Sequence, residues 1–116
     1  MLAALEGDDV DRVLLDALSD PSKPVRRRAA RAALCGWRRV QANEALLARV
    51  PPVLEQDAHD RPDDDARWFR LGAAREFVGD LDGAIEAYGR QVVLDRLNPH
   101  VPSHLETLRK RREAAR

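Results

Sequence analysis

The chain has 116 residues, of which 44% are hydrophobic and only 4% are aromatic. A chain of this length forms one domain around a single core. Twenty basic and twenty acidic residues cancel to a formal net charge of zero, so no overall field draws the chain toward nucleic acid or a membrane. Alanine and leucine dominate the apolar residues, which favours closely packed helices.

The cysteine count and the apolar runs indicate the compartment. A single cysteine, Cys35, excludes a disulfide framework within the chain and fits a reducing compartment. Its alanine-rich surroundings predict a small core residue. No apolar run approaches the ~18–20 residues of a membrane span, and the first residues lack a signal pattern. We therefore expect a cytoplasmic protein without a membrane partner. Eighteen arginines against two lysines indicate a GC-rich bacterial genome.

The charges are segregated along the chain. Residues 1–20 carry one arginine against six acidic residues, whereas residues 22–50 carry eight basic residues against one glutamate. Residues 51–66 again carry one arginine against six acidic residues. Alternating blocks of opposite sign favour packing of acidic elements beside basic ones, within the chain or between copies.

The first third of the chain has the pattern of two helices joined by a proline turn. Apolar residues at helical spacing predict a helix from about Asp9 that ends before Pro21. Pro24 suits the first turn of the next helix, whose apolar face includes Val25, Ala29 and Trp37. Residues 2–6 read as the end of an earlier helix.

This region resembles a HEAT repeat of the bacterial type over about residues 9–38. The resemblance rests on Leu14-Leu15-Asp16-Ala17-Leu18-Ser19-Asp20-Pro21, Pro24-Val25-Arg26 and Ala29-Ala30-Arg31-Ala32-Ala33-Leu34. Members of the family commonly place an aspartate and an arginine in this turn to tie neighbouring repeats together. Asp20 and Arg26 match those positions.

The middle of the chain is expected to contain two short helices and a linker. Residues 42–50 have helical spacing, and Pro51-Pro52 is expected to interrupt that helix because proline lacks the amide and clashes with the preceding turn. Residues 53–58 read as a short helix. Residues 57–65 form an acidic segment that lacks the glycine and closing glutamate of a calcium loop, so we expect a linker and helix cap there.

The last part of the chain has the strongest pattern. Trp68 and Leu71 fall on one helical face, Gly72 allows close approach of a second helix, and Gly79-Asp80 breaks the chain between helices. Ala84 is small where the two helices would cross. These residues resemble a tetratricopeptide repeat over about residues 65–98, with part of a further unit to 114.

Two positions depart from that repeat pattern. Arg75 stands where the family usually has an aromatic residue, and Gln91 stands where a small residue is usual. We expect the aliphatic stem of Arg75 to cover its site with the guanidinium in water.

The tetratricopeptide resemblance implies a partner-binding groove on the first helix of the repeat. The positions that match its inner face are Phe69, Ala73, Glu76 and Phe77. Family members that clamp a carboxylate place lysine and asparagine there, so a carboxylate clamp is not expected. Two interpretations remain open: the apolar face receives a partner helix, or the HEAT-like helices cover it.

The final helix is expected to begin at Pro102 or Ser103 and to expose Leu105 and Leu108, because no later helix follows to cover them. Solenoid repeats bury their apolar faces only against neighbours. We therefore predict self-association or a tight protein partner through these leucines.

Basic side chains form a second candidate site. The arginines concerned are Arg26, Arg27, Arg28, Arg31, Arg38 and Arg39. One interpretation is a phosphate-binding stripe, with Arg27 and Arg31 as its central contacts. The favoured interpretation is a solvated face that pairs with the acidic segments, since no basic excess exists over the whole chain.

Neither a metal site nor a cofactor is expected from the sequence. His100 and His104 have a spacing that suits a metal on a helix, but Pro102 lies between them and further ligands are lacking. The sequence lacks a Ser/His/Asp arrangement, a phosphate-cradling glycine loop and a haem motif.

We therefore expect an all-α fold, a right-handed antiparallel helical solenoid of about seven helices. Residues 1–56 are HEAT-like, 57–65 form the acidic linker, and 66–116 are tetratricopeptide-like, in one continuous domain. The expected function is a non-enzymatic protein-protein interaction or scaffolding module. One alternative is a nucleic-acid-binding module that uses the Arg26–Arg39 stripe. Another is an accessory helical domain of a larger bacterial enzyme or multihaem cytochrome.

Overall fold

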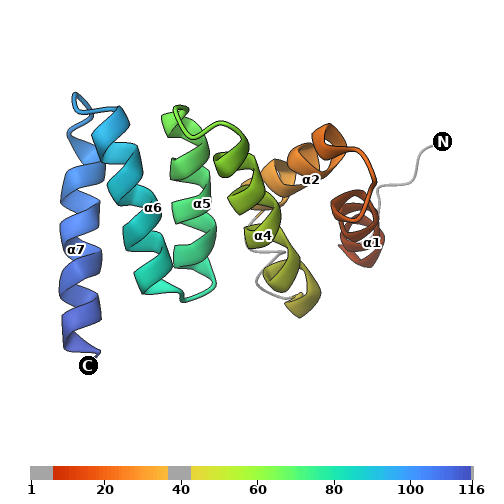
Figure 1. Ribbon diagram of the computed structural model, residues 1–116. Coiled ribbons are helices and arrows are strands. Elements are labelled where there is room, and N and C mark those ends of the chain that lie inside the picture. Colours follow the sequence, from red (N-terminus) through yellow and green to blue (C-terminus); the bar gives the residue numbers. More distant parts are fainter. Residues whose placement is uncertain (1–6, 37–42, 116) are drawn as a thin grey trace. The chain divides into compact units, whose positions relative to one another are not determined.

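The computed structural model describes residues 7–36 and 43–115 (Figure 1). Within these ranges the chain forms six helices and no strands, which confirms the all-α class. The helix expected at residues 2–6 and the side chain of Trp37 lie outside the described residues. The chain divides into two compact units, residues 1–54 and residues 55–116, and the division falls within one helix, α4 (Glu44–Asp60).

The first unit contains α1 (Gly7–Leu18), α2 (Lys23–Cys35) and the beginning of α4. Helix α2 has proline in its first turn, as the sequence predicts, and buries three alanines, Ala29, Ala30 and Ala33. Small side chains allow α1 and α2 to pack closely, with Leu18 buried at the end of α1. The Cys35 side chain is exposed, so the expectation of a core cysteine is wrong. It is the last residue of α2, beyond the buried alanines.

Arg26 fixes the turn between α1 and α2. Its guanidinium Nη1 donates to the carbonyl of Asp20 at 2.6 Å and to that of Pro21 at 2.9 Å. The Asp20 carboxylate accepts from the amide of Ser22 at 2.8 Å. These contacts satisfy the carbonyls of Asp20 and Pro21 and the amide of Ser22. Asp20 and Arg26, the two residues singled out by the HEAT resemblance, thus each make hydrogen bonds within this turn.

Asn43 connects the start of α4 to α1. Its side-chain oxygen accepts from the amides of Ala45 at 3.0 Å and Leu46 at 3.2 Å, as expected of a helix-capping residue. Its side-chain nitrogen donates to Asp11 at 3.0 Å. Nearly two turns later, Arg49 donates to the Ser19 hydroxyl at 3.0 Å. Polar contacts therefore tie the first half of α4 to the α1–α2 hairpin.

Pro51-Pro52 does not interrupt α4, contrary to the sequence-based expectation. The helix continues from Glu44 to Asp60 with both prolines inside it. Val50 and Leu54, on either side of the prolines, are fully buried. Burial of these flanking side chains offsets the loss of two backbone hydrogen bonds.

The segment 57–65 is mostly helical, so the expected acidic linker is much shorter than nine residues. Helix α4 includes Asp57 to Asp60, and α5 (Asp65–Phe77) begins after the turn at residues 61–64. Asp57 is buried beside Ala58, and its carboxylate pairs with Arg67 of α5. Of the last aspartates, Asp64 caps α5 and Asp65 lies in its first turn, as the sequence predicts.

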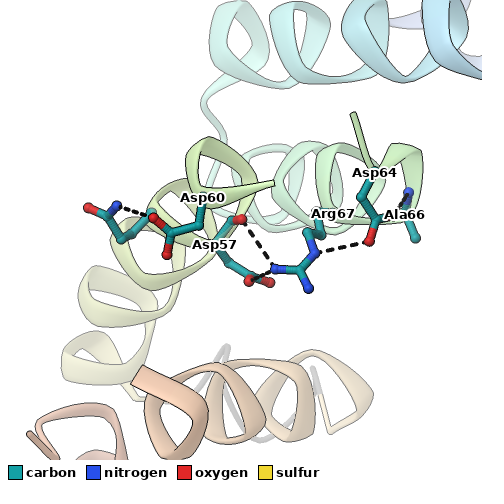
Figure 2. Close-up of polar contacts among 6 residues, drawn as sticks. Asp57, Asp60, Asp64, Ala66 and Arg67 are labelled. Atoms are coloured by element: carbon teal, nitrogen blue, oxygen red, sulfur yellow. Dashed lines mark hydrogen bonds and ion pairs between the residues drawn. The ribbon is translucent and has the colours of Figure 1, made fainter. Parts of the chain in front are cut away.

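Arg67 holds the end of α4 to the start of α5 (Figure 2). Its guanidinium pairs with the buried Asp57 carboxylate, and its Nε donates to the Asp64 carboxylate at 3.0 Å. Asp64 also caps α5 by accepting from the Ala66 amide at 3.0 Å. The hydrogen bond from Arg67 holds the pKa of the Asp64 carboxyl below its usual value. One arginine therefore compensates two carboxylates from adjacent helices.

The second unit is completed by α6 (Leu81–Leu94) and α7 (His100–Ala114), with α6 lying between α5 and α7 (Figure 1). Trp68 and Leu71 are buried on α5, which confirms the face predicted from their spacing. The indole nitrogen of Trp68 donates to the Pro62 carbonyl at 2.9 Å, so this buried donor is satisfied.

Gly72 lies where α5 packs directly against a side chain of α6. A Cβ atom at this position would lie 2.7 Å from the ring of Tyr88 on α6. A side chain here would therefore force the two helices apart. The close approach predicted for Gly72 is confirmed, and its partner is the tyrosine ring.

Arg75 connects three helices, and its guanidinium is not left in water. It donates to the Gly83 carbonyl of α6 at 3.0 Å and lies 3.7 Å from the Glu55 carboxylate of α4. The turn it spans contains Gly79 at a φ of 87°, a conformation that favours glycine, and Asp80 as the cap of α6. The expected solvated guanidinium is wrong, because the Gly83 carbonyl and the Glu55 carboxylate are within its reach.

Leu105 and Leu108 lie inside the second unit rather than on its surface. Both are buried, together with Val101, in a cluster with Ala84 and Ile85 of α6. The sequence-based prediction that these leucines form an association surface is therefore wrong. The apolar stripe of α7 packs onto α6 of the same chain, so no later helix is needed to cover it.

We predict that Trp68→Ala lowers the free energy of unfolding by about 3–5 kcal/mol, the usual cost of emptying a large core site. Phe69→Ala is the matched control, because the neighbouring ring is 45% exposed and its removal leaves no enclosed cavity. Urea unfolding followed by circular dichroism measures both. A loss below ~1 kcal/mol for Trp68→Ala contradicts its place in the core.

We further predict that Arg67→Met destabilises the chain by about 3 kcal/mol, because it leaves the buried Asp57 carboxylate without its guanidinium. A double-mutant cycle with Asp57→Asn separates this coupling from the loss of packing. Urea unfolding of the four proteins gives the coupling energy. Additive effects of the two changes would show that the ion pair does not hold α4 to α5.

Candidate protein-binding face

The residues singled out on α5 share one face of that helix. Phe69 and Phe77 are exposed, at 45% and 43%, and Ala73 between them is half-buried. We call Phe69, Ala73, Glu76 and Phe77 the α5 face. Two partly exposed aromatic rings two turns apart provide contact area without requiring the helix to move.

Glu76 is the polar centre of the α5 face and joins three helices. Its Oε1 accepts from the Tyr88 hydroxyl of α6 at 3.0 Å and lies 2.7 Å from His104 Nε2 of α7. Its Oε2 lies 3.7 Å from Arg111 Nη1, also on α7. Sequence analysis identified Glu76 but missed these three partners. The sequence did indicate that His104 and Arg111, two turns apart on one helix, share a face of it and can contact the same carboxylate.

Aromatic contacts fix the rings around this carboxylate. The Tyr88 ring lies edge-on to the His104 ring with centroids 5.4 Å apart, and it lies 5.7 Å from the Phe69 ring. Tyr88 also fills the space left by Gly72. The exposed Phe69 ring is thus backed by a buried tyrosine whose own position is set by α5, α6 and α7.

The environment of Tyr88 determines its protonation. Burial, reinforced by the negative charge of Glu76 and its hydrogen bond, raises the pKa of the Tyr88 hydroxyl well above its usual value. Tyr88 therefore stays neutral and donates a hydrogen bond at physiological pH. Its hydroxyl donates to the Glu76 carboxylate at 3.0 Å.

The basic candidates lie in the other unit. Arg27 and Arg31 belong to α2, are partly buried, and each has an interaction within the chain. Arg26 donates to two backbone carbonyls of its own turn, while Arg38 and Arg39 lie outside the described residues. The chain therefore uses at least three of the six arginines for internal contacts.

Helix α7 begins at His100, not at Pro102 or Ser103 as expected, so His100 and His104 lie about one turn apart on it. His104 contacts Glu76 and Tyr88, whereas His100 lies at the exposed start of α7. Over residues 7–36 and 43–115, no three side chains of the metal-ligating types form a group. None of the helices in these ranges is both long and apolar enough to cross a membrane.

A second apolar surface, at the end of α6 and in the turn that follows it, was missed by sequence analysis. Val93, Leu94 and Leu97 are exposed at 63%, 42% and 95%. We call these three residues the α6 apolar surface. It adjoins an open pocket of about 410 Å³ whose lining includes Pro62, Trp68, Glu86, Gly89 and Arg90. The sequence signal was the apolar run at residues 92–94. Three consecutive residues of a helix do not all face its buried side, so part of this run had to be exposed.

Comparison with protein families, curated proteins and solved structures finds no match to this chain.

We predict that the only tyrosine of the chain, Tyr88, ionises in the folded protein at a pH clearly above the ~10 of a free phenol. The unfolded chain then loses this proton first, so the stability of the fold falls as the pH rises above ~10. Absorbance at the tyrosinate band, with circular dichroism at each pH, measures the folded titration.

Glu76→Gln removes the neighbouring charge and is expected to shift this titration toward ordinary values, while burial keeps it above the urea-unfolded reference. Glu86→Gln, at an exposed site on α6, is the matched control and is expected to leave the titration unchanged. A folded wild-type titration that coincides with the unfolded one contradicts the described environment of Tyr88.

Proposed function

We propose that this protein is a non-enzymatic protein-interaction module and that its second unit binds a segment of another protein on the α5 face. The observation that carries the proposal is the pair of exposed rings, Phe69 and Phe77, on the same helix as the Glu76 network. Exposed aromatic residues on a rigid backbone are typical of protein-binding surfaces.

The rigidity of this face supports the proposal. Glu76 has hydrogen-bonding partners on both α6 and α7, and Phe69 rests against the buried Tyr88. A partner therefore meets a surface whose side chains are already ordered, which reduces the entropy lost on binding. An amphipathic segment with two large apolar side chains suits rings two turns apart on α5.

The basic side chains of α7 favour an acidic segment as the partner. Helix α7 carries Arg109, Lys110, Arg111 and Arg112 against Glu106 and Glu113, and Arg111 is exposed beside Glu76. Acidic side chains of a partner that covers Phe69 and Phe77 would lie near the basic C-terminal part of α7. We therefore propose an acidic amphipathic peptide as the ligand class.

The proposed architecture is the one that both resemblances imply: a right-handed antiparallel solenoid, HEAT-like first and tetratricopeptide-like second. Three consecutive helices of the second unit, with α6 between α5 and α7, support this proposal. The glycine at the α5–α6 crossing supports it as well. Nucleic-acid binding through α2 is not favoured, because its arginines make internal contacts.

Selection of peptides from a displayed random library against the immobilised chain tests the proposed function. We predict enrichment of acidic amphipathic peptides, and a loss of affinity of at least about tenfold for Phe69→Asp/Phe77→Asp, equivalent to ~1.4 kcal/mol. Isothermal titration calorimetry of an enriched peptide gives the two dissociation constants.

The matched control is Val13→Asp/Val25→Asp, which places the same charges at two exposed apolar positions of the first unit. It is expected to leave peptide affinity unchanged. Enriched peptides that bind the phenylalanine variant as tightly as wild type overturn the proposed face. Sub-micromolar binding of duplex or single-stranded oligonucleotides, abolished by Arg27→Glu/Arg31→Glu, would favour the nucleic-acid alternative instead.

A further inference from the structure

We propose that His104 of α7 is a contact residue of the peptide-binding site and holds an acidic side chain of the partner when its ring is protonated. The α5 face then binds its ligand more tightly at pH 5.5 than at pH 7.5. This inference rests on the proposed function and adds to it a specificity-determining residue. The first observation is that the His104 side chain is 43% exposed although it contacts residues of α5 and α6.

His104 lies against the same ring that supports the α5 face. The Tyr88 ring has the His104 ring edge-on to it at 5.4 Å and the Phe69 ring at 5.7 Å. His104 Nε2 also lies 2.7 Å from Oε1 of Glu76, which belongs to the α5 face. A peptide that covers Phe69 and Glu76 therefore comes within reach of the exposed part of the His104 ring.

One ring nitrogen of His104 is used inside the chain and the other is not. An ionised carboxylate only accepts hydrogen bonds, so Nε2 is the nitrogen that carries the proton in the contact with Glu76. Within residues 7–36 and 43–115, Nδ1 has no hydrogen-bonding partner. In the neutral ring Nδ1 is an acceptor, which does not attract a carboxylate, whereas in the imidazolium it is a donor. Protonation therefore creates the group that an acidic partner needs.

The charges around His104 determine the direction of the pH effect. Glu76 of α5 and Arg111 of α7 lie 3.7 Å apart and have opposite charges. Tyr88, the titratable group of α6 that contacts His104, is neutral because burial raises its pKa. These groups carry no net charge together, and the imidazolium adds one positive charge to them. An acidic peptide is therefore attracted more strongly as the pH falls.

The exposure of His104 limits the size of the effect. Ion pairs between exposed side chains change an equilibrium by at most about fivefold, because water screens the charges. A bound peptide covers the ring and excludes part of this water, which strengthens the pair. We therefore expect binding to be about fivefold tighter at pH 5.5 than at pH 7.5.

The chain supplies a matched control for this effect. It has three histidines, and histidine is the side chain that ordinarily changes charge between pH 5 and 8. His100 is exposed on α7 about one turn from His104, and His59 contacts Glu55 and Trp68. The carboxylates of a peptide ordinarily titrate near pH 4, so they stay ionised in this range. His100→Gln thus tests whether any histidine of α7 produces the effect.

Calorimetric titration of the full chain at pH 7.5 and 5.5 tests the inference, with an acidic peptide enriched in the selection described above as the probe. The wild type and His100→Gln are expected to bind about fivefold more tightly at pH 5.5. His104→Gln keeps a donor for Glu76 but cannot gain a charge, so it is expected to bind equally at both pH values. Circular dichroism at each pH verifies that the three proteins are folded.

Proton uptake provides a second measurement, because a proton that tightens peptide binding must itself be bound more tightly in the complex. Titrations at pH 6.5 in buffers of different ionisation enthalpy measure it. The wild type is expected to take up a fraction of a proton on binding, and His104→Gln none. Equal affinity at both pH values, or a pH dependence that His104→Gln retains, overturns this inference and leaves the proposed function intact. A selection that enriches no peptide overturns both.

Discussion

The second unit depends on the contact between Gly72 of α5 and the ring of Tyr88 on α6. The ring occupies the space that a side chain at residue 72 would need, so α6 packs on α5 through the tyrosine ring. Trp68 and Leu71 pack beside this point and are fully buried. Interiors are close-packed and tolerate added volume poorly, so any residue larger than glycine here displaces the tyrosine.

The position of Tyr88 determines the surface that faces a partner. Its hydroxyl orders Glu76, its ring backs Phe69, and its edge meets His104. Ionisation of the hydroxyl would place a second negative charge beside Glu76, which is why burial and that charge both raise the pKa of Tyr88. The same residue therefore serves core packing and the arrangement of the α5 face.

Local sequence pattern predicted the contacts made between residues close in the chain. The buried face of α5 at Trp68 and Leu71, the close approach at Gly72 and the acidic start of α5 follow from helical spacing and capping rules. Leu108 was predicted to be exposed, yet it is buried against α6. Its burial depends on how α7 packs against α6, which local sequence pattern does not show. The continuity of α4 was missed for a related reason, since burial of Val50 outweighs the local effect of the prolines.

Solution NMR of the full chain tests the Gly72–Tyr88 contact most directly, because the chain has one tyrosine and its ring protons are unambiguous. The α-proton of Gly72 that points where a Cβ would stand lies against this ring. The account predicts a strong nuclear Overhauser effect between that proton and the Tyr88 ring, with a ring-current shift that its geminal partner lacks. Absence of the effect, with two equivalent and unshifted Gly72 α-protons in a folded sample, would contradict it.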